Sequence, residues 1–167
     1  MESATNLFDL LNNGGFFIEE AQCHEELFRK MGQILYEQGY VKDGYFDAIM
    51  KREEKYPTGL VTEAFPICMP HVEAEYVKKN AVVIVKLEPP VAFQRMDDPT
   101  QQIMSELAFF IIIADKSSHT KAIASLARIF MSPETLRKIK SASSHEEILE
   151  IIRNQNCERK PERRECK

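Results

Sequence analysis

The sequence predicts a single α/β domain in which helices cover both faces of a mixed β-sheet. Segment 107–114 is apolar almost throughout, which is typical of a central strand, and 81–87 is rich in β-branched residues. Elsewhere, apolar residues recur every three or four positions, the spacing of amphipathic helices. The 167 residues are enough for one domain with a hydrophobic core and few for two, and no internal repeat is visible.

The first third of the chain is predicted to be mainly helical. We expect residues 1–18 to form an irregular lead-in, with a turn at 12–15 where asparagine and glycine cluster. A first helix is expected over 19–38, and Gly39 stands where a helix C-terminus belongs. A second helix is expected over 43–55. The inward-facing side chains are expected to be Leu27, Met31, Ile34 and Leu35 in the first helix and Phe46, Ile49 and Met50 in the second.

The middle of the chain is predicted to supply the strands. A short strand is expected at 64–68, followed by the strand at 81–87. We expect Pro89–Pro90 to end that strand, because proline donates no hydrogen bond to a strand ladder. Residues 91–95 are then expected to form a short edge strand, and 107–114 the central strand of the sheet.

The last third is predicted to be helical again. A helix is expected over 118–131, and Ser132–Pro133 has the cap and first-turn proline that open another short helix. Residues 144–147 have capping-box spacing ahead of a third helix. We therefore expect residues 1–153 to form the domain and 154–167 to be a charged, disordered tail.

Composition excludes several classes of function. A net charge of −4 does not favour a nucleic-acid surface. The longest strongly apolar run, 107–114, is too short to span a bilayer, and residues 1–6 lack the regions of a signal peptide. We therefore expect a cytoplasmic protein without direct membrane insertion. Four cysteines lack zinc-site spacing and are expected to be free thiols: Cys23, Cys68, Cys157 and Cys166.

The segment from Arg52 to His71 carries the candidate chemistry. It turns at Pro57–Gly59 and ends on His71 behind Pro70, which restricts the backbone of Met69 to extended geometry. A histidine held at the end of such a stiffened segment suggests a placed nucleophile or ligand. A surface loop merely punctuated by prolines explains the spacing equally well, and an arginine near a helix C-terminus is favoured by the helix dipole alone.

His119 is the second candidate. It follows the buried strand and lies in the first turn of a helix, where unpaired N–H groups attract anions and disfavour protonation of the imidazole. If Arg52, His71 and His119 converge, they suit phosphoryl transfer through a phosphohistidine. An unprotonated imidazole attacks phosphorus, arginine holds the phosphoryl oxygens, and the second imidazole donates a hydrogen bond. This chemistry requires no cofactor.

Two other chemistries use the same region. A metal site could combine both histidines with nearby acidic and thiol side chains, but no His-x-x-x-His or Cys-x-x-Cys element fixes its geometry. A Cys68 nucleophile with His71 as its base is weaker, since side chains three residues apart in an extended segment point to opposite faces. The candidate metal ligands are Cys68, His71, Glu73, Glu75 and His119.

Two ordered motifs resemble a known family. Arg52–Glu53, Pro57–Leu60 and Ala64–His71 resemble the Arg-Glu, Pro-Thr-Gly and Ala-x-x-Pro-His pattern of IIA components of the bacterial phosphoenolpyruvate-dependent sugar phosphotransferase system, in the fructose–mannitol superfamily. The segment His119–Phe130 resembles that family's helix beginning with a histidine. The resemblance covers roughly residues 5–153 and implies an α/β sandwich with a mixed sheet flanked by helices.

The resemblance implies a role for each candidate. His71 matches the histidine that takes the phosphoryl group from the phosphocarrier protein HPr and passes it to the IIB component, and through it to the membrane IIC permease. His119 matches the second active-site histidine, and Arg52 the arginine near the phosphate. Pro57–Gly59 would shape the loop beside the site. A regulatory IIA-like domain, whose phosphorylation state controls a partner, would use the same residues.

The chain departs from fructose and mannitol members in two places. Val61–Glu63 replaces the usual glycines, which predicts a stiffer loop, and Val72–Ala74 replaces the small residue after the histidine. The Pro-His-x-Glu-Ala sequence is more similar to the galactitol-type branch, so we expect galactitol or a related polyol. Apolar residues beside His71 are candidates either for partner docking or for the local core: Phe65, Ile67, Met69 and Val72.

Overall fold

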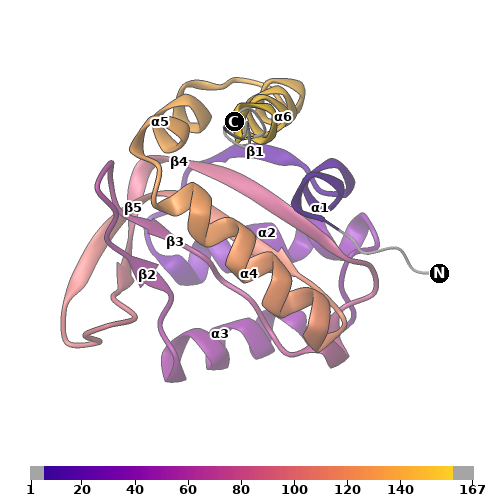
Figure 1. The fold of residues 1–167 in the computed structure, drawn as a ribbon. Helices are drawn as coiled ribbons and strands as arrows, with labels where there is room; N and C mark the ends of the chain where they lie inside the picture. Colours follow the sequence, from indigo (N-terminus) through magenta and orange to yellow (C-terminus); the bar gives the residue numbers. More distant parts are fainter. Residues whose placement is uncertain (1–5, 160–167) are drawn as a thin grey trace, which may run out of the picture.

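The computed structural model describes residues 6–159 and contains a five-stranded mixed sheet in the order β1-β4-β5-β3-β2 (Figure 1). The strands are β1 (Phe16–Glu19), β2 (Gly59–Leu60), β3 (Ile67–Cys68), β4 (Ala81–Gln94) and β5 (Gln102–Ile112). The helices are α1 (Leu7–Asn13), α2 (His24–Glu37), α3 (Tyr45–Lys55), α4 (Lys116–Phe130), α5 (Pro133–Ser141) and α6 (His145–Arg159), with a 3₁₀ turn at Ala74–Tyr76.

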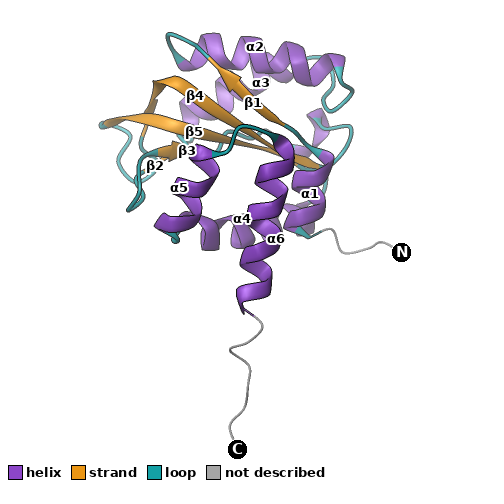
Figure 2. Cartoon of the chain, turned by 90° about the horizontal axis from the view of Figure 1, so that it is seen from above, coloured by secondary structure: helices purple, strands orange, loops and turns teal. Residues whose placement is uncertain are grey.

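The elements form three layers, which confirms the predicted fold class. Helices α2 and α3 cover one face of the sheet, and α1, α4, α5 and α6 cover the other (Figure 2). Each face has its own cluster of buried apolar side chains. Alternate residues of β5 enter the two clusters, with Phe110 on the α2–α3 side and Phe109 on the other. This two-sided burial explains why the strand is apolar throughout, as predicted.

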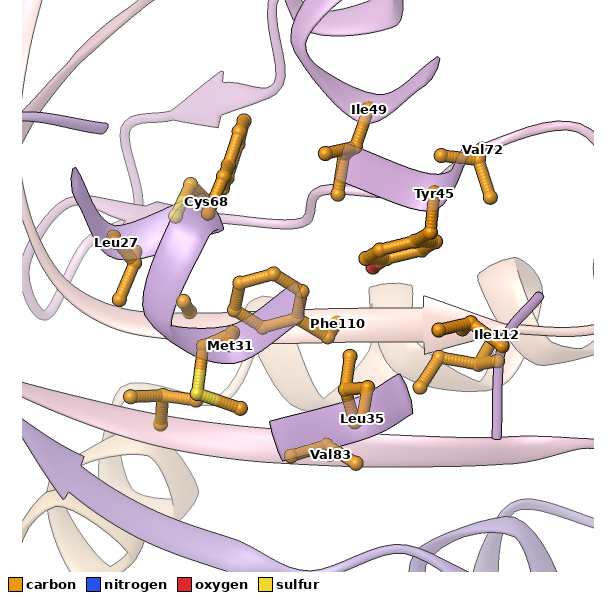
Figure 3. Close-up of a cluster of buried hydrophobic side chains, with 14 of the residues drawn as sticks. Leu27, Met31, Leu35, Tyr45, Ile49, Cys68, Val72, Val83, Phe110 and Ile112 are labelled. Atoms are coloured by element: carbon orange, nitrogen blue, oxygen red, sulfur yellow. The ribbon is translucent and has the colours of Figure 1, made fainter. Parts of the chain in front are cut away.

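The cluster beneath α2 and α3 positions the strands that lead to the candidate site (Figure 3). Leu27, Met31 and Leu35 come from α2, and all three are fully buried, as predicted. Ile49 of α3 is also fully buried, whereas Phe46 and Met50 are only partly so. Gly39 has a φ of 81°, which lets the chain turn out of α2 where the sequence predicts its end.

The N-terminal segment differs from the prediction. Residues 7–13 form helix α1 rather than an irregular lead-in, because the Asn6 side chain accepts a hydrogen bond from the Asp9 N–H at 2.8 Å and Leu10 and Leu11 are buried. A helix this short shows too few turns for its periodicity to be recognised. The next helix begins at His24 rather than at residue 19, since residues 16–19 are used as strand β1.

Strand β4 continues through the two prolines that were expected to end it. Residues 81–86 and 91–94 both pair with β5, and the register shifts between Lys86 and Val91. Pro89 and Pro90 lie in this irregular part, where no ladder N–H is needed. The prediction of a separate edge strand at 91–95 is therefore wrong: residues 91–94 are the second half of β4, beside the central strand.

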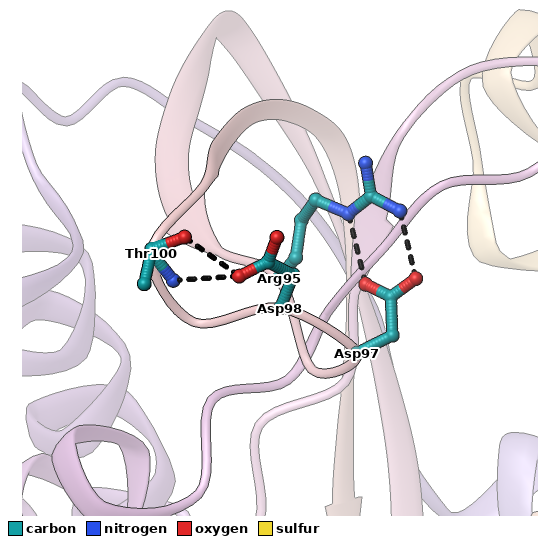
Figure 4. Close-up of polar contacts among 4 residues, drawn as sticks. All are labelled: Arg95, Asp97, Asp98 and Thr100. Carbon is teal, nitrogen blue, oxygen red and sulfur yellow. Dashed lines mark hydrogen bonds and ion pairs between the residues drawn. The ribbon is translucent and has the colours of Figure 1, made fainter.

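The β4–β5 connection is closed by two local polar contacts (Figure 4). Arg95 forms a bidentate pair with Asp97, with distances of 2.8 and 2.7 Å, and Asp98 accepts hydrogen bonds from the N–H and hydroxyl of Thr100. The N–H of Met96 donates to the Gly59 carbonyl at 2.8 Å. The hairpin end is thereby attached to the turn that precedes β2.

The strand expected at 64–68 is shorter than predicted. Only Ile67 and Cys68 pair, with β2 on one side and β5 on the other. Residues 62–65 turn instead, because the Thr62 hydroxyl accepts from the N–H groups of Ala64 and Phe65. A threonine that binds its neighbours' backbone in this way offers an alternative to strand pairing.

The C-terminal helices begin at the predicted caps. Ser132 accepts from the Thr135 N–H at the start of α5, and Ser144 accepts from the Glu147 N–H at the start of α6. The second reciprocal bond of the predicted capping box is displaced by one residue, since Glu147 accepts from the Ser143 N–H. Helix α6 runs to Arg159, past the expected boundary at 153, and residues 160–167 of the predicted tail lie outside the described residues.

Candidate active site

His71 lies just beyond β3 and is fixed by backbone contacts. The Ile111 N–H donates to the Pro70 carbonyl at 3.1 Å, which extends the pairing of this segment with β5. The His71 Nδ1 lies 2.9 Å from the Met69 carbonyl oxygen. A carbonyl can only accept, so Nδ1 carries the hydrogen, and in the neutral ring Nε2 holds the free lone pair.

The surroundings of His71 favour this neutral ring. Burial lowers its pKa, and the charges of His119 and Arg52 lower it further, against the opposing effects of the Met69 carbonyl and Glu73. A neutral imidazole with Nδ1–H is a nucleophile at Nε2 without any prior proton transfer. The carbonyl of Met69 therefore determines which nitrogen of the neutral ring has a free lone pair.

Arg52 faces that nitrogen from the last turn of α3. Its Nη2 lies 3.3 Å from His71 Nε2, and its Nη1 donates a hydrogen bond to Glu73 at 3.0 Å. The guanidinium carbon lies 4.9 Å from the centre of the Tyr56 ring. The Arg52 Nε–H is buried and has no hydrogen-bond partner within residues 6–159. A planar cation with an unused donor next to a nucleophile suits an anionic group bound between them.

His119 approaches from the opposite face of the sheet. It lies at the start of α4, whose first turn is capped by Asp115 through a 2.9 Å hydrogen bond to the Ser118 N–H. Its ring centre is 5.1 Å from that of His71, and the two ring planes are inclined by 57°. Burial lowers the pKa of His119, and the Arg52 charge adds to this effect. The structure thus brings Arg52, His71 and His119 together.

A buried carboxylate, that of Glu53, follows Arg52 in α3 and binds the turn that precedes β2. Glu53 accepts hydrogen bonds from the Thr58 N–H at 2.8 Å and from the Thr58 hydroxyl at 2.9 Å. Burial raises the pKa of Glu53 to about 7, although the Thr58 bonds and the Arg52 charge oppose the shift. Neither Glu53 nor Thr58 was predicted as a site residue from the sequence. Their positions in the Arg-Glu and Pro-Thr-Gly motifs, on either side of one turn, are the sequence feature that could have identified them.

The competing chemistries fit the structure poorly. Cys68 is fully buried in the α2–α3 cluster, and burial raises the pKa of its thiol, which disfavours the thiolate needed by a nucleophile or metal ligand. Within residues 6–159 no three His, Cys, Asp or Glu side chains are grouped as a metal site, and no helix there is long and apolar enough to cross a membrane.

The apolar residues near His71 divide into two kinds. Ile67 and Val72 are buried and belong to the core clusters. Phe65 and Met69 are partly exposed and pack against the α4–α6 cluster. Of the four candidates for partner docking, Phe65 and Met69 are therefore the two that reach the surface.

Comparison with known proteins identifies relatives of this arrangement. Residues 9–155 match the family model described as "Phosphoenolpyruvate-dependent sugar phosphotransferase system, EIIA 2". The chain is 27% identical over 135 residues to the galactitol-specific EIIA component of Escherichia coli K12, covering 81% of this chain and 85% of the relative. It is 31% identical over 109 residues to the nitrogen regulatory protein of Klebsiella oxytoca, covering 64% of each.

A solved complex contains a similar fold. In the structure of enzyme IIA-mannitol with phosphorylated enzyme IIB-mannitol from Escherichia coli, the matching chain superposes with a TM-score of 0.66 and 27% identity. The match covers 83% of this chain and 94% of that one.

Proposed function

Since this chain belongs to the EIIA 2 family of the phosphoenolpyruvate-dependent sugar phosphotransferase system, we propose that it carries a phosphoryl group on His71. The observation that carries this proposal is the orientation of the His71 ring, in which Nδ1 is bound to the Met69 carbonyl and Nε2 faces Arg52. In this proposal the chain works in the cytoplasm, between a phosphorylated donor protein and an acceptor protein.

The transfer needs no proton movement at His71. The Nε2 lone pair attacks phosphorus of the donor's phosphohistidine, an N–P bond forms, and the donor's N–P bond breaks with its electron pair returning to the donor ring. The phosphoryl oxygens carry the negative charge of the transition state, and the Arg52 guanidinium can donate to two of them once it turns from Nε2. Onward transfer repeats the exchange, with His71 as the leaving group.

His119 is placed to assist both steps. Its ring lies beside that of His71, and the low pKa favoured by burial keeps it neutral, with one N–H available to donate. Such a donor stabilises the charged phosphoryl oxygens while the N–P bond is made or broken. We assign His119 an assisting role and His71 the covalent one.

The partners follow from the relatives. We propose HPr as the donor, as the motif resemblance implies, and a IIB component as the acceptor; the solved complex of a similar chain with phosphorylated IIB supports the acceptor. The galactitol-specific EIIA component is the relative that supports uptake of galactitol or a related polyol. The nitrogen regulatory relative supports the second candidate, in which phosphorylation of His71 controls a partner protein.

Phosphorylation by a reconstituted donor chain tests the proposal. The protein is incubated with phosphoenolpyruvate, Enzyme I and HPr, and its intact mass is measured under alkaline conditions, where phosphohistidine survives. We expect a gain of one phosphate that brief acid treatment removes. No gain in the presence of demonstrably phosphorylated HPr from the same organism would overturn the proposal.

Onward transfer separates transport from regulation. The phosphorylated protein is mixed with a purified galactitol-type IIB domain, and the loss of phosphate from one chain and its gain by the other are followed by mass. Transfer supports the uptake role. Retention of the phosphate with every sugar-type IIB domain tested would favour the regulatory role.

Replacing His119 by alanine is expected to leave His71 phosphorylated but to slow transfer to IIB by about 10-fold to 100-fold, the value of one hydrogen bond to a charged group. His119→Gln keeps an N–H donor and should lose less. Rapid-mixing kinetics with the isolated phosphoprotein measure the rate. Equal onward rates for the alanine variant and the wild type would remove His119 from the mechanism.

A further inference from the structure

The geometry points to Glu53 as a positioning residue for phosphoryl transfer, because its carboxylate connects the helix that carries Arg52 to the strand pair that leads to His71. The inference rests on the proposed function of His71. The contacts that support it are those of Glu53, which are separate from the contacts of His71 Nε2. Glu53 does not touch His71 in the structure, so any influence must pass through Thr58 or through Arg52.

The first step of the connection is a buried pair of residues. Only 5% of the Glu53 surface and 2% of the Thr58 surface are exposed. The carboxylate receives both donors of Thr58, the backbone N–H through Oε2 and the hydroxyl through Oε1. Hydrogen bonds to an ionised carboxylate are stronger than those between neutral groups. The two bonds from Thr58 to ionised Glu53 therefore hold this turn firmly.

The second step runs from Thr58 to His71 along two short strands. Gly59 pairs with Cys68 and Leu60 with Ile67, so β2 and β3 together contribute two residue pairs. His71 follows three residues after Cys68. On its other side β3 pairs with β5, so the β2 side of this short ladder is the part whose position depends on the residue that leads into it. Thr58 is the residue immediately before the ladder.

The turn has little room to adjust if Thr58 moves. The Gly59 carbonyl accepts from the Met96 N–H, and a β-carbon at Gly59 would lie 2.5 Å from the Gln94 carbonyl oxygen. The turn is thus packed directly against the end of β4. A change at Thr58 is therefore transmitted along β2 rather than absorbed locally.

Glu53 also acts on the helix that carries Arg52. The two residues are neighbours in the last turn of α3, with Arg52 directed at His71 and Glu53 at Thr58. Releasing the carboxylate from Thr58 would free this turn to rotate or fray. Because a displacement of about 1 Å at a reacting group can cost about 100-fold in rate, a small rotation of Arg52 is enough to matter.

Several charged or titratable groups face Glu53. Arg52 adjoins Glu53 and its charge opposes the rise of the Glu53 pKa, while the charge of Glu53 adds to the raised pKa of the buried Cys68 thiol. On its other side, a cavity of about 350 Å³ is lined by Glu53, Glu54, His24 and Phe93, among others. The protonated form of Glu53 has one acceptor fewer for Thr58, so the support weakens as pH falls through about 7.

The test compares Glu53→Gln with Thr58→Val, Thr58→Ser and Glu54→Gln. Steady-state phosphoryl transfer from phosphorylated HPr to IIB through each variant is measured between pH 5.5 and 8.5, with kcat and KM for HPr separated. We expect Glu53→Gln and Thr58→Val to lower kcat by about tenfold while KM for HPr stays within about twofold, since the docking surface is unchanged. The part of the wild-type decline that follows protonation of Glu53 near pH 7 should be absent in Glu53→Gln, whose rate should fall on acidification only as His71 itself is protonated.

The controls separate positioning from general damage. Thr58→Ser keeps the hydroxyl and should transfer at nearly the wild-type rate. Glu54→Gln makes the same charge change at an exposed neighbour and should leave the rate and its pH profile unchanged. If Glu53→Gln fails to fold, the kcat of Thr58→Val alone tests the inference. Wild-type kcat and an unaltered pH profile in the folded variants would overturn the inference.

A second readout does not depend on transfer. Arg52 lowers the pKa of His71, so displacement of Arg52 in Glu53→Gln should raise the pKa of His71, measured by NMR titration of the ring nitrogens. Removal of a nearby negative charge alone would change that pKa in the opposite direction. A wild-type protein that accepts no phosphate would refute the proposed function, whereas an unshifted His71 pKa would refute the role of Glu53.

Discussion

Replacing His71 by alanine is expected to abolish acceptance of the phosphoryl group. No other described side chain presents an imidazole nitrogen both freed by a backbone hydrogen bond and placed beside an arginine. His119 lacks such a bond to a carbonyl among the described contacts, and His145 uses its Nε2 on the Leu11 carbonyl at 2.7 Å. Intact-mass analysis under alkaline conditions should show no added phosphate on the variant.

The matched control is His145→Ala, which removes a histidine that joins α6 to α1 and leaves the proposed site intact. It should gain phosphate at the wild-type rate as long as it is folded, which circular dichroism checks. Acid-labile phosphate on His71→Ala at the wild-type rate would show that the assignment of the acceptor is wrong.

Replacing Arg52 by alanine is expected to slow phosphoryl transfer by about 100-fold to 1000-fold, the effect typical of removing a donor aimed at developing charge. Arg52→Lys keeps the positive charge but loses the planar fork, so its rate should fall between those of the alanine variant and the wild type. Rapid quenching of transfer from phosphorylated HPr measures both rates. A rate for Arg52→Ala within a factor of about two of wild type would contradict this role.

The same variant makes a prediction about pH. The Arg52 charge contributes to the lowered pKa of both His71 and His119, so in Arg52→Ala both pKa values should rise toward their ordinary value. A protonated Nε2 cannot attack phosphorus, so the loss of rate on acidification should begin at higher pH in Arg52→Ala than in the wild type. Arg52→Lys should retain most of the wild-type pKa values. Titration of the ring nitrogens by NMR checks these shifts separately from the kinetics.

The sequence predicted the layers of the fold better than its short elements. Segment 107–114 and the helices are long enough for burial to leave a periodic or continuous apolar pattern. Helix α1 and strand β2 are stabilised by caps and by pairing with distant segments, which local patterns do not report. The continuation of β4 through Pro89–Pro90 depends on a register shift against β5, which is a tertiary feature.

The candidate site was predictable to the extent that its residues stand in recognisable motifs. Arg52, His71 and His119 were identified by position and by resemblance, and the structure places them together. The free nitrogen of His71 could not be predicted, because it is decided by the orientation of one carbonyl. The role inferred for Glu53 depends on its contact with Thr58, and a charged residue at the end of a helix is ordinarily assumed to face solvent.

The position of the site between two hydrophobic clusters links the proposed phosphorylation to cooperative folding. Arg52 is carried by a helix packed on one face of the sheet, and His119 by a helix packed on the other. Loosening either layer would separate one of them from His71 even if the sheet persisted. A partly folded intermediate would therefore not accept a phosphoryl group from the donor. After complete reaction with the proposed donor, the phosphate content of a preparation would then report the fraction of molecules in which both layers are assembled.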